Sequence, residues 1–424
     1  MDTIFALSSG APPAAIAVIR ISGPDASSAL GKLAGDLPEP RRISYRTLQT
    51  ASGATLDHAI VIWLPGPNNA TGEDCAELHC HGGRAVAQAV LRELGTIAGL
   101  REAEPGEFTR RAFLNGRIDL AEAEGLADLL EAETEIQRAS AISMAGGMVS
   151  HQVELWREEV LRLSAQVEAS LDFSDEDDVE GVPLTFGTGL EKLKEGVSGW
   201  LDHPHAERLK EGYKVVIAGP PNAGKSTLFN ALTDSEAAIT SPIAGTTRDV
   251  IERSVALSGI PFSFIDTAGL RSEDTDAIEA IGIDRAHRQI KGADCVLWLG
   301  PESKGPIGAW EIESQIDLDR HETKSEPKHR VSALSGEGLD ALRSDLVEAA
   351  KLTMPKPGEV ALNTRQRAGI AELAEFLDAA VKTEDLLILA EHLRRARVAL
   401  DMLVGRTTTE DMLDALFGRF CIGK

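Results

Sequence analysis

The stretch Gly219-Pro220-Pro221-Asn222-Ala223-Gly224-Lys225-Ser226 decides the fold of the central part of this chain. Its spacing is that of a phosphate-binding loop, and it lies between an apolar run at 215–218 and a helical pattern at 227–232. In that context, backbone N–H groups and a helix N-terminus converge on a di- or triphosphate. Lys225 can reach the β- and γ-phosphate oxygens, and the Ser226 hydroxyl can ligate Mg²⁺. The sequence therefore predicts a nucleotide-binding domain.

The composition is typical of an acidic multidomain protein. Its 424 residues are 43% hydrophobic and 26% charged, and a chain of this length favours two or three domains. The formal net charge of −24 opposes a wide nucleic-acid-binding surface, because phosphate groups would be repelled. Contact with nucleic acid would then need a local basic patch or a basic partner protein. We expect a cytoplasmic location, because there is no run of about 18 apolar residues and no signal-like N-terminus. The cysteines lack metal-site spacing and suit a reducing compartment; they are Cys75, Cys80, Cys295 and Cys421.

Periodicity divides the chain into four segments. Residues 1–115 mix short β-like runs with turns, and residues 116–211 become helical. Residues 212–351 alternate strands and helices, and residues 352–424 are helical again. The simplest arrangement packs the two helical segments in one bundle, with the α/β domain inserted between them. Each helical segment carries an apolar stripe, formed by Val153, Trp156, Val160, Leu163, Val167 and Leu171 in the first and by Leu389, Leu393, Ala396, Leu400 and Leu403 in the second.

Three further segments, in order behind the phosphate loop, indicate a GTPase. Gly245-Thr246-Thr247-Arg248-Asp249 lies where a switch loop supplies a second Mg²⁺-ligating hydroxyl, which we assign to Thr247. A predicted strand runs into Asp266-Thr267-Ala268-Gly269, where Asp266 would hold Mg²⁺ through a water and the Gly269 N–H would sense the γ-phosphate. Ser332-Ala333-Leu334 resembles the loop that contacts the guanine O6 in translation-factor-type GTPases. Each segment is weak alone, and their order and spacing make the set strong.

The guanine-selecting motif is degraded. GTPases carry Asn-Lys-x-Asp, and the best match here is Ser314-Gln315-Ile316-Asp317. The Asp317 carboxylate can accept the guanine N1 and N2 protons, while the missing Asn and Lys remove a hydrogen bond and a stem that packs on the base. We therefore expect GTP over ATP, with weak base affinity. The predicted GTP-binding residues are Asn222, Ala223, Gly224, Lys225, Ser226, Thr227, Ser241, Pro242, Ile243, Ala244, Gly245, Thr246, Thr247, Asp266, Thr267, Ala268, Gly269, Asp317, Ser332, Ala333 and Leu334.

In Ras-like GTPases, the residue after this Asp-x-x-Gly motif is a glutamine that orients the water for attack on the γ-phosphate. Here Leu270 follows Asp-Thr-Ala-Gly, so another group must orient that water. At this point the chain resembles the MnmE family of tRNA-modification GTPases, also called TrmE. The resemblance runs end to end, through Val18–Gly23, Gly72-Glu73-Asp74, His81-Gly82-Gly83, Pro105–Phe108 and Phe420–Lys424. It implies a multidomain α/β plus all-α fold, with an N-terminal α+β tetrahydrofolate-binding domain, a helical bundle and an inserted Ras-like phosphate-loop GTPase domain.

In that family a K⁺ ion takes the place of an arginine finger. The resemblance assigns its ligands to Asn222 and to backbone oxygens near Ser241, Ile243 and Thr246. A cation there stabilises transition-state charge without a separate activating protein. The resemblance also implies that Glu279 positions the attacking water through a second water, although from the residue alone a solvated helix-face carboxylate is favoured. Two GTPase domains would have to meet, so hydrolysis should require dimers.

The resemblance implies that residues 1–115 bind a tetrahydrofolate derivative, either 5-formyl- or 5,10-methylene-tetrahydrofolate, and mediate dimerisation. Glu77 matches the pterin-facing carboxylate, and Arg20, Arg117 and Lys424 match the other folate-contacting positions. From the residues alone, an ion pair that supports the fold is favoured for Arg20 and Glu77. Cys421 would lie near the reacting one-carbon unit, as a nucleophile, as an acid or as a lining residue.

The implied reaction joins these sites. A homodimer, combined with the flavoprotein MnmG in a heterotetramer, would add an aminomethyl or carboxymethylaminomethyl group to C5 of the tRNA wobble uridine. Glycine and ammonium are both open as the amine donor. A ribosome-assembly GTPase switch is an alternative, but such proteins usually append a basic RNA-binding module that neither flank supplies. A folate-dependent methyltransferase with a regulatory GTPase domain is a second alternative, which turnover of folate without MnmG would favour.

Overall fold

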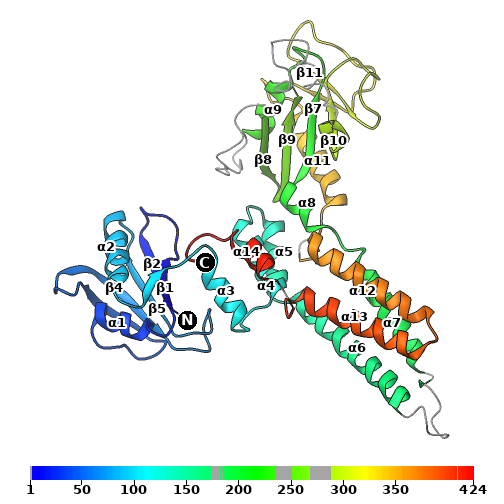
Figure 1. Cartoon of the computed structure of the whole chain (residues 1–424). Helices are drawn as coiled ribbons and strands as arrows, with labels where there is room; N and C mark the ends of the chain where they lie inside the picture. The colour runs from blue at the N-terminus through cyan, green and yellow to red at the C-terminus, as the bar shows by residue number, and fades with distance from the viewer. Residues whose placement is uncertain are drawn as a thin grey trace, which may run out of the picture. The chain divides into compact units, whose positions relative to one another are not determined.

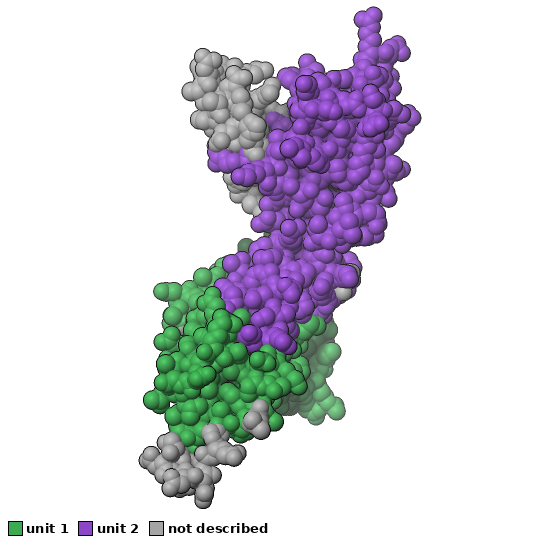
Figure 2. Space-filling view, turned by 90° about the vertical axis from the view of Figure 1, so that its right-hand side faces the viewer, with its two compact units in different colours: residues 1–127, 145–193, 372–424 green, residues 128–144, 194–371 purple. Residues whose placement is uncertain are grey.

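The computed structural model describes residues 2–172, 182–183, 185–234, 251–267, 288–356, 358–407 and 409–424. Contacts divide the chain into two compact units, each built from segments that are far apart in sequence. Unit 1 holds residues 1–127, 145–193 and 372–424, and unit 2 holds residues 128–144 and 194–371; Figure 2 colours them separately. The division at residues 115, 211 and 351 that periodicity suggests stays a prediction.

The N-terminal part of unit 1 is an α+β domain built on a six-stranded sheet (Figure 1). The strand order is β3-β4-β5-β2-β1-β6, and neighbouring strands are antiparallel except β1 and β6, which are parallel. The elements are β1 (Thr3–Leu7), β2 (Ile16–Ser22), α1 (Ala26–Ala34), β3 (Ile43–Gln49), β4 (Thr55–Leu64), β5 (Cys75–His81), α2 (Arg84–Gly95), β6 (Leu100–Glu102) and α3 (Glu107–Leu114).

Alternation along the strands gives this sheet two different faces. On β1, Phe5 joins the core with α1 and α2, whereas Ile4 packs with Phe108 of α3 on the opposite face. The same period of two places Arg20 of β2 and Glu77 of β5 on the α3 face, since the residues on either side of each belong to the α1 and α2 core. The α3 face therefore combines apolar contacts with two oppositely charged side chains.

The helical part of unit 1 brings the two distant helical segments together, as the sequence predicts. Helix α6 (Met148–Asp172) packs along α13 (Leu386–Leu403), and both bury their predicted apolar stripes, except for the partly buried Leu171. An ion pair between Arg157 Nε and Asp401 Oδ1, at 3.0 Å, joins the two helices. The other helices that lie wholly or partly in this unit are α4 (Leu120–Glu131), α7 (Thr185–Trp200), α12 (Thr364–Lys382) and α14 (Glu410–Phe417).

Unit 2 contains an α/β domain whose six-stranded sheet has the order β12-β11-β10-β7-β9-β8. Neighbouring strands are parallel except β8 and β9. The loops after the parallel strands meet at one edge of the sheet, which is where such sheets bind ligands. The elements are α5 (Glu135–Ala145), of which residues up to Met144 lie in unit 2, α8 (Ala206–Glu211), β7 (Tyr213–Ala218), α9 (Lys225–Thr233), β8 (Ile251–Leu257), β9 (Ile260–Asp266), β10 (Cys295–Trp298), β11 (Trp310–Ser314), β12 (His329–Val331) and α11 (Leu339–Thr353).

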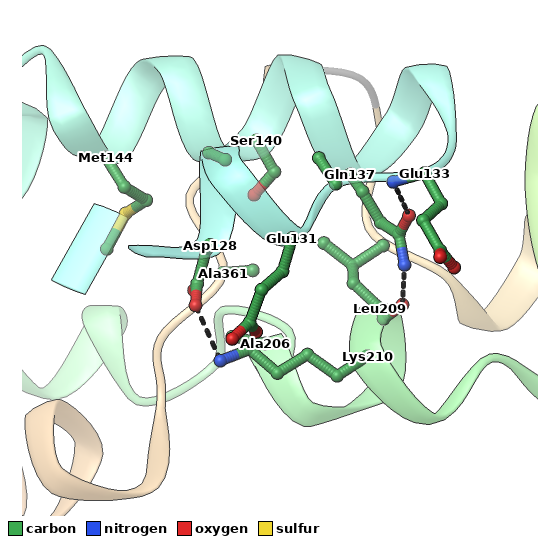
Figure 3. A pocket seen from close by; sticks show the side chains of 12 residues that line it. Asp128, Glu131, Glu133, Gln137, Ser140, Met144, Ala206, Leu209, Lys210 and Ala361 are labelled. Atoms are coloured by element: carbon green, nitrogen blue, oxygen red, sulfur yellow. Dashed lines mark hydrogen bonds and ion pairs between the residues drawn. The ribbon is translucent and has the colours of Figure 1, made fainter. Parts of the chain in front are cut away.

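The core of this domain extends into the helical segment 128–144. Ile136 of α5 is buried in the same cluster as Leu209 of α8, Val215 of β7 and Phe262 of β9. Gln137 Nε2 also donates a hydrogen bond to the Leu209 carbonyl at 2.8 Å (Figure 3). The expected fold class is confirmed: an N-terminal α+β domain, a helical bundle and an inserted α/β domain. Within the described part of the chain, no helix is both long enough and apolar enough to span a membrane.

Candidate nucleotide-binding site

The phosphate loop connects the carboxyl end of β7 to the start of α9 in unit 2. Strand β7 is buried at almost every position, so the sheet fixes where the loop begins. Gly224 ends the loop with φ 87° and is the N-cap of α9. A Cβ at Gly224 would lie 3.3 Å from the Gln315 side chain, so both backbone conformation and close approach favour glycine there. The first turn of α9 therefore presents free N–H groups at the mouth of the loop.

Lys225 and Ser226 hold the charged and the metal-ligating groups of this loop. Lys225 is 7% exposed, and its Nζ donates a hydrogen bond to the Pro220 carbonyl at 2.7 Å, which keeps the ammonium over the loop. Ser226 Oγ donates a hydrogen bond to Oδ2 of Asp266 at 2.6 Å. Asp266 is fully buried at the end of β9, beside Ile217 of β7 in the parallel register. A hydroxyl and a buried carboxylate side by side form an oxygen donor set that fits Mg²⁺.

The base-recognition segment is tied to the phosphate loop at two points. Ser314 Oγ donates a hydrogen bond to the Ala223 carbonyl at 2.8 Å, and Gln315 Nε2 donates one to the Asn222 carbonyl at 3.3 Å. Gln315 has a positive φ of 61°, which turns the chain sharply after β11. The sequence suggested that losing Asn from Asn-Lys-x-Asp removes a hydrogen bond; Ser314 instead supplies one to the loop.

Asp317 lies in the small cavity where a base would bind. Ser332 Oγ donates a hydrogen bond to Oδ1 of Asp317 at 2.6 Å, which orients the exposed carboxylate. The same cavity includes Gly224 and Thr227 from the phosphate-loop side and Ala333 and Leu334 from the segment after β12. The structure thus brings together predicted residues from the phosphate loop, the Asp317 segment and the Ser332 segment. Thr267 follows Asp266 at the end of β9, and its Oγ1 donates to the Ile217 carbonyl at 2.9 Å.

A second layer of side chains anchors the Asp317 segment. His321 is within hydrogen-bonding distance of the Leu318 carbonyl through Nδ1 and of Glu313 Oε1 through Nε2, both at 3.0 Å. The Leu318 carbonyl and then Glu313 raise the pKa of His321. Burial raises the pKa of Glu313, but Arg330 at 2.9 Å and His321 outweigh burial and hold it below its ordinary value. The position of the Asp317 segment therefore depends on a clamp formed by His321 between the Leu318 carbonyl and Glu313, and this clamp can gain or lose a proton.

Several predicted residues lie outside the described part of the chain. They are Ser241, Pro242, Ile243, Ala244, Gly245, Thr246, Thr247, Ala268, Gly269 and Glu279. Of the residues assigned to K⁺, Asn222 is described. It has a positive φ of 63° and an exposed side chain at the mouth of the phosphate loop. Asparagine tolerates this left-handed backbone conformation better than most residues.

Arg20 and Glu77 form an ion pair on the α3 face of the N-terminal sheet. They are opposite each other in the β2–β5 register, and Arg20 Nη2 lies 2.9 Å from Glu77 Oε1. His79 Nε2 lies 3.2 Å from Glu77 Oε2. Burial raises the pKa of Glu77, but His79 and Arg20 outweigh burial, so the pKa lies below its ordinary value. The ion pair that the residues favour is present. Its role in supporting the fold and its contact with folate both stay predictions.

The C-terminal tail reaches the same face of the sheet. Phe108, whose ring lies 5.8 Å from the Arg20 guanidinium, donates its backbone N–H to the Lys424 carbonyl at 3.2 Å. Gly423 has φ 93° and packs so closely on the Leu7 carbonyl that a Cβ would not fit. Cys421 is exposed on this docked tail. The structure thus places the backbone of Lys424 beside Phe108, whose ring faces Arg20.

Arg117 is exposed, and its contacts differ from those of Arg20 and Glu77. A Cβ at Gly72 would lie 3.2 Å from Arg117 Cγ, and Arg117 also lines a cavity of about 490 Å³ together with Ser150 and Arg406. No described contact joins Arg117 to Arg20 or Glu77. Its assignment to folate therefore stays a prediction.

Comparisons with known proteins cover the whole chain. A model of the MnmE helical domain matches residues 120–421, and a model of the N-terminus of the GTP-binding protein TrmE matches residues 3–117. The tRNA modification GTPase MnmE of Erythrobacter litoralis is 63% identical over 100% of both chains. The protein of the same name from Novosphingobium aromaticivorans is 57% identical, again over 100% of both chains. The chain belongs to the MnmE family of tRNA modification GTPases.

Membership of the MnmE family confirms the enzyme class expected from the sequence, a GTP hydrolase that acts in tRNA modification. Among solved structures, the G domain of the T. maritima FeoB iron transporter is 27% identical and covers 32% of this chain and 98% of its own, with a TM-score of 0.23.

Sequence reasoning missed some residues of this MnmE site. From the sequence, Ser314 and Gln315 only remove the contacts that Asn and Lys of the motif would make. In the structure, both side chains donate hydrogen bonds to the phosphate loop. Sequence reasoning also missed Glu313 and His321, which are eight residues apart and meet only after the chain turns back behind β11. The available signal was the polar Ser314 at the carboxyl end of β11, where parallel sheets place ligand-binding groups.

Proposed function

We propose that the protein is a K⁺-activated, dimerisation-dependent GTPase that works with the flavoprotein MnmG. Together they add an aminomethyl or carboxymethylaminomethyl group to C5 of the tRNA wobble uridine, using a one-carbon unit from a tetrahydrofolate derivative. The observation that carries the proposal is the Ser226–Asp266 contact at 2.6 Å beside the buried Lys225. This arrangement supports GTP binding and hydrolysis, which drive conformational change and supply no atoms to the product.

The chain's own residues divide the binding of GTP between them. Lys225 and the first N–H groups of α9 bind the phosphates, and Asp317, held by Ser332, accepts hydrogen bonds from the guanine edge. Ser226 and Thr247 would ligate Mg²⁺, with Asp266 behind Ser226. Mg²⁺, when bound, neutralises charge that develops on the phosphate oxygens.

The proposed K⁺ site uses Asn222, Ser241, Ile243 and Thr246. Support comes from the exposed Asn222 side chain at the mouth of the phosphate loop. K⁺ supplies positive charge near the leaving diphosphate, and Glu279 orients the attacking water. GTP turnover should be much faster in potassium than in sodium buffer and should rise with protein concentration as dimers form. Equal rates in both buffers at every concentration would contradict the K⁺ site.

The proposed folate site lies on the α3 face of the N-terminal sheet. Glu77 would receive the pterin edge, Arg20, Arg117 and Lys424 would contact the rest of the folate, and Cys421 would lie near the one-carbon unit. The Arg20–Glu77 pair supports this, because a carboxylate held ionised can accept further hydrogen bonds. Glu77→Gln should weaken 5-formyl-tetrahydrofolate binding while GDP binding is unchanged. Unchanged folate binding would contradict the role of Glu77.

We propose a cytoplasmic location for the protein. The whole proposal is tested in vitro with labelled tRNA and purified components. Modification of the wobble uridine should require the protein, MnmG, GTP and a tetrahydrofolate one-carbon donor together. The net charge of −24 supports a division of labour in which MnmG makes most tRNA contacts. Modified tRNA formed without MnmG, or full modification without GTP, would contradict the proposal.

A further inference from the structure

The end of strand β5 carries a histidine that is held by a buried carboxylate. His81 is the last residue of β5, and its ring Nδ1 lies 2.8 Å from Oδ1 of Asp57 on the neighbouring strand β4. The backbone N–H of His81 donates a hydrogen bond to Asp57 Oδ2, also at 2.8 Å. The side chain of Asp57 is 9% exposed, whereas that of His81 is 73% exposed. Asp57 therefore fixes one side of an imidazole ring whose other side is open.

The protonation of this pair follows from its contacts. Burial raises the pKa of Asp57, but hydrogen bonds from His81 and from the His58 N–H outweigh burial, so the pKa lies below its ordinary value. An ionised carboxylate only accepts hydrogen bonds, so Nδ1 is the nitrogen that carries the proton in the neutral His81 ring. The lone pair is then on Nε2, which has no hydrogen-bond partner within the described part of the chain. Nε2 is thus a free proton acceptor.

The backbone on both sides of the ring is fixed. His81 is paired with Ile16 of β2. The next residue, Gly82, donates its N–H to the Ala15 carbonyl at 3.2 Å and accepts a hydrogen bond from the Ala14 N–H at 3.0 Å. A Cβ at Gly82 would lie 2.1 Å from the Ala14 carbonyl oxygen, so this close approach requires glycine. These contacts preorganise the imidazole, as a catalytic group requires.

The pair lies on the strand that carries the proposed folate contact. The period of two along β5 gives His81, His79 and Glu77 the same side of the sheet. Glu77 is about 13 Å along the strand from His81. His79 lies between them, with its Nε2 3.2 Å from Glu77 Oε2. A free proton acceptor thus lies on the same face as the site where we propose that folate binds.

The proposed reaction needs a base, because its amine donor is protonated at neutral pH. Glycine and ammonium are both open as the donor, and in the protonated form of either the nitrogen lone pair is held in an N–H bond. Histidine is the side chain that most often accepts such a proton in catalysis. A carboxylate on Nδ1 orients the ring and stabilises the imidazolium that forms. Asp57 and His81 have this arrangement.

We propose that His81 is the general base that activates the amine donor and that Asp57 is its positioning residue, an inference that rests on the proposed function. One N–H bond of the ammonium group breaks, its electron pair stays on the nitrogen, and the proton forms a new N–H bond at His81 Nε2. The imidazolium keeps its Nδ1 hydrogen bond to Asp57 and releases the proton from Nε2 to water, to which the ring is open. The free amine is the nucleophile for the one-carbon unit.

The test measures the rate of wobble-uridine modification by the full-length protein with MnmG, GTP, a tetrahydrofolate one-carbon donor and saturating glycine or ammonium. His81→Gln should lower this rate at pH 7 by about 100-fold or more. GTP turnover and 5-formyl-tetrahydrofolate binding should stay unchanged, which checks that the variant folds. His58→Gln is the matched control, because His58 is an exposed histidine of β4 whose ring contacts Thr47. It should leave all three measurements unchanged.

The pH profile distinguishes a base from a residue that only supports the fold. Without His81 the reaction depends on amine that is already deprotonated in solution, so the ratio of the original rate to the variant rate should narrow from pH 7 to pH 9. The charged or titratable groups on the adjoining ends of β4, β5 and α2 are Asp57, His58, His79 and Arg84, and the adjoining end of β2 is apolar. All of these groups are retained in His81→Gln. A ratio that stays constant with pH would overturn the proposal.

Asp57→Asn tests the positioning role. It should lower the modification rate of the original protein but change that of His81→Gln little, because Asp57 acts through the ring. Equal losses in both backgrounds would overturn the positioning role of Asp57. A rate for His81→Gln within about twofold of the original would overturn the role of His81 while the proposed function stands. If the original protein itself formed no modified tRNA, the proposed function would fail and this inference with it.

Discussion

The phosphate half and the base half of the nucleotide site are built in different ways. The phosphate half rests on buried groups fixed by two neighbouring parallel strands, with Lys225 7% exposed and Asp266 fully buried. The base half rests on an exposed carboxylate, Asp317, which Ser332 and the His321 clamp orient from behind. Phosphate binding therefore follows from the fold itself, whereas base selection depends on a few exposed side chains.

This difference explains how a shortened guanine motif can still be compatible with a GTPase. The phosphate loop takes its conformation from β7, α9 and its glycines, and Ser314 and Gln315 retain the link between the two halves. What the motif has lost is the lysine stem that would pack on the base. Changes in the phosphate half should thus affect every nucleotide, and changes at Asp317 should affect guanine nucleotides alone.

The largest effect is expected from Lys225→Ala in the phosphate half. Loss of charge-assisted hydrogen bonds to the phosphates should weaken GDP and ADP binding alike by about 100-fold or more. Binding of labelled nucleotides checks this. The control is Lys351→Ala, because Lys351 pairs with Glu348 on the surface of α11 and should have no effect. A loss confined to GDP would contradict the division into two halves.

A smaller and base-specific effect is expected from Asp317→Ala. Removing the carboxylate that accepts the guanine protons should weaken GDP binding by about 10- to 100-fold and leave ADP binding unchanged. Asp319→Ala removes a carboxylate from the same exposed segment, outside the cavity, and should change neither. If both nucleotides weakened equally, Asp317 would have a structural role and no role in base selection.

A third effect, smaller again, tests the link between the halves. Ser314→Ala removes one hydrogen bond to the Ala223 carbonyl and should weaken GDP and ADP binding by about two- to tenfold. Nucleotide competition assays at one temperature measure it. Unchanged affinity for both nucleotides would show that the loop holds its conformation without Ser314.

The smallest effect concerns pH and the His321 clamp. Nδ1 faces the Leu318 carbonyl and Nε2 faces Glu313, so only the protonated ring donates to both. The pKa of His321 is raised above its ordinary 6.5, so its stabilisation is complete below pH 6.5 and is lost as the pH rises through the raised value. Asp317 and Arg330 are the other charged groups near the clamp.

Thermal unfolding across pH 6 to 8.5 should therefore show a small decrease in stability above pH 6.5 in the original protein. His321→Gln should remove that slope, because glutamine does not titrate. A slope that persists unchanged in His321→Gln would assign it to another group.

Much of this architecture follows from sequence pattern alone. The apolar stripes of α6 and α13 predicted that these helices pack together, and the run before Gly219 predicted the strand that carries the phosphate loop. The order of the motifs assigns Ser226 and Asp266 to the same Mg²⁺ ion, and their side chains are in contact. These predictions succeed because they depend on local periodicity and on a motif whose geometry is set by the backbone.

Other features depend on contacts between distant parts of the chain. Docking of the tail at Leu7 and Phe108 and the clamp of His321 on Glu313 join residues that no local pattern links. The switch residues and Glu279 lie outside the described part of the chain, so their roles stay predictions. The phosphate half could be predicted because Ser226 and Asp266, although 40 residues apart, each belong to a motif of fixed geometry. The base half was harder to predict because its motif is degraded and its support comes from Ser332 and His321.

The most direct test of the two-part nucleotide site is competition of unlabelled GDP and ADP against a labelled guanine nucleotide on the full-length protein. If Asp317 and Ser332 select guanine despite the shortened motif, GDP should displace the label at a concentration at least about tenfold lower than ADP. Displacement by both nucleotides at the same concentration would contradict guanine selection by the base half.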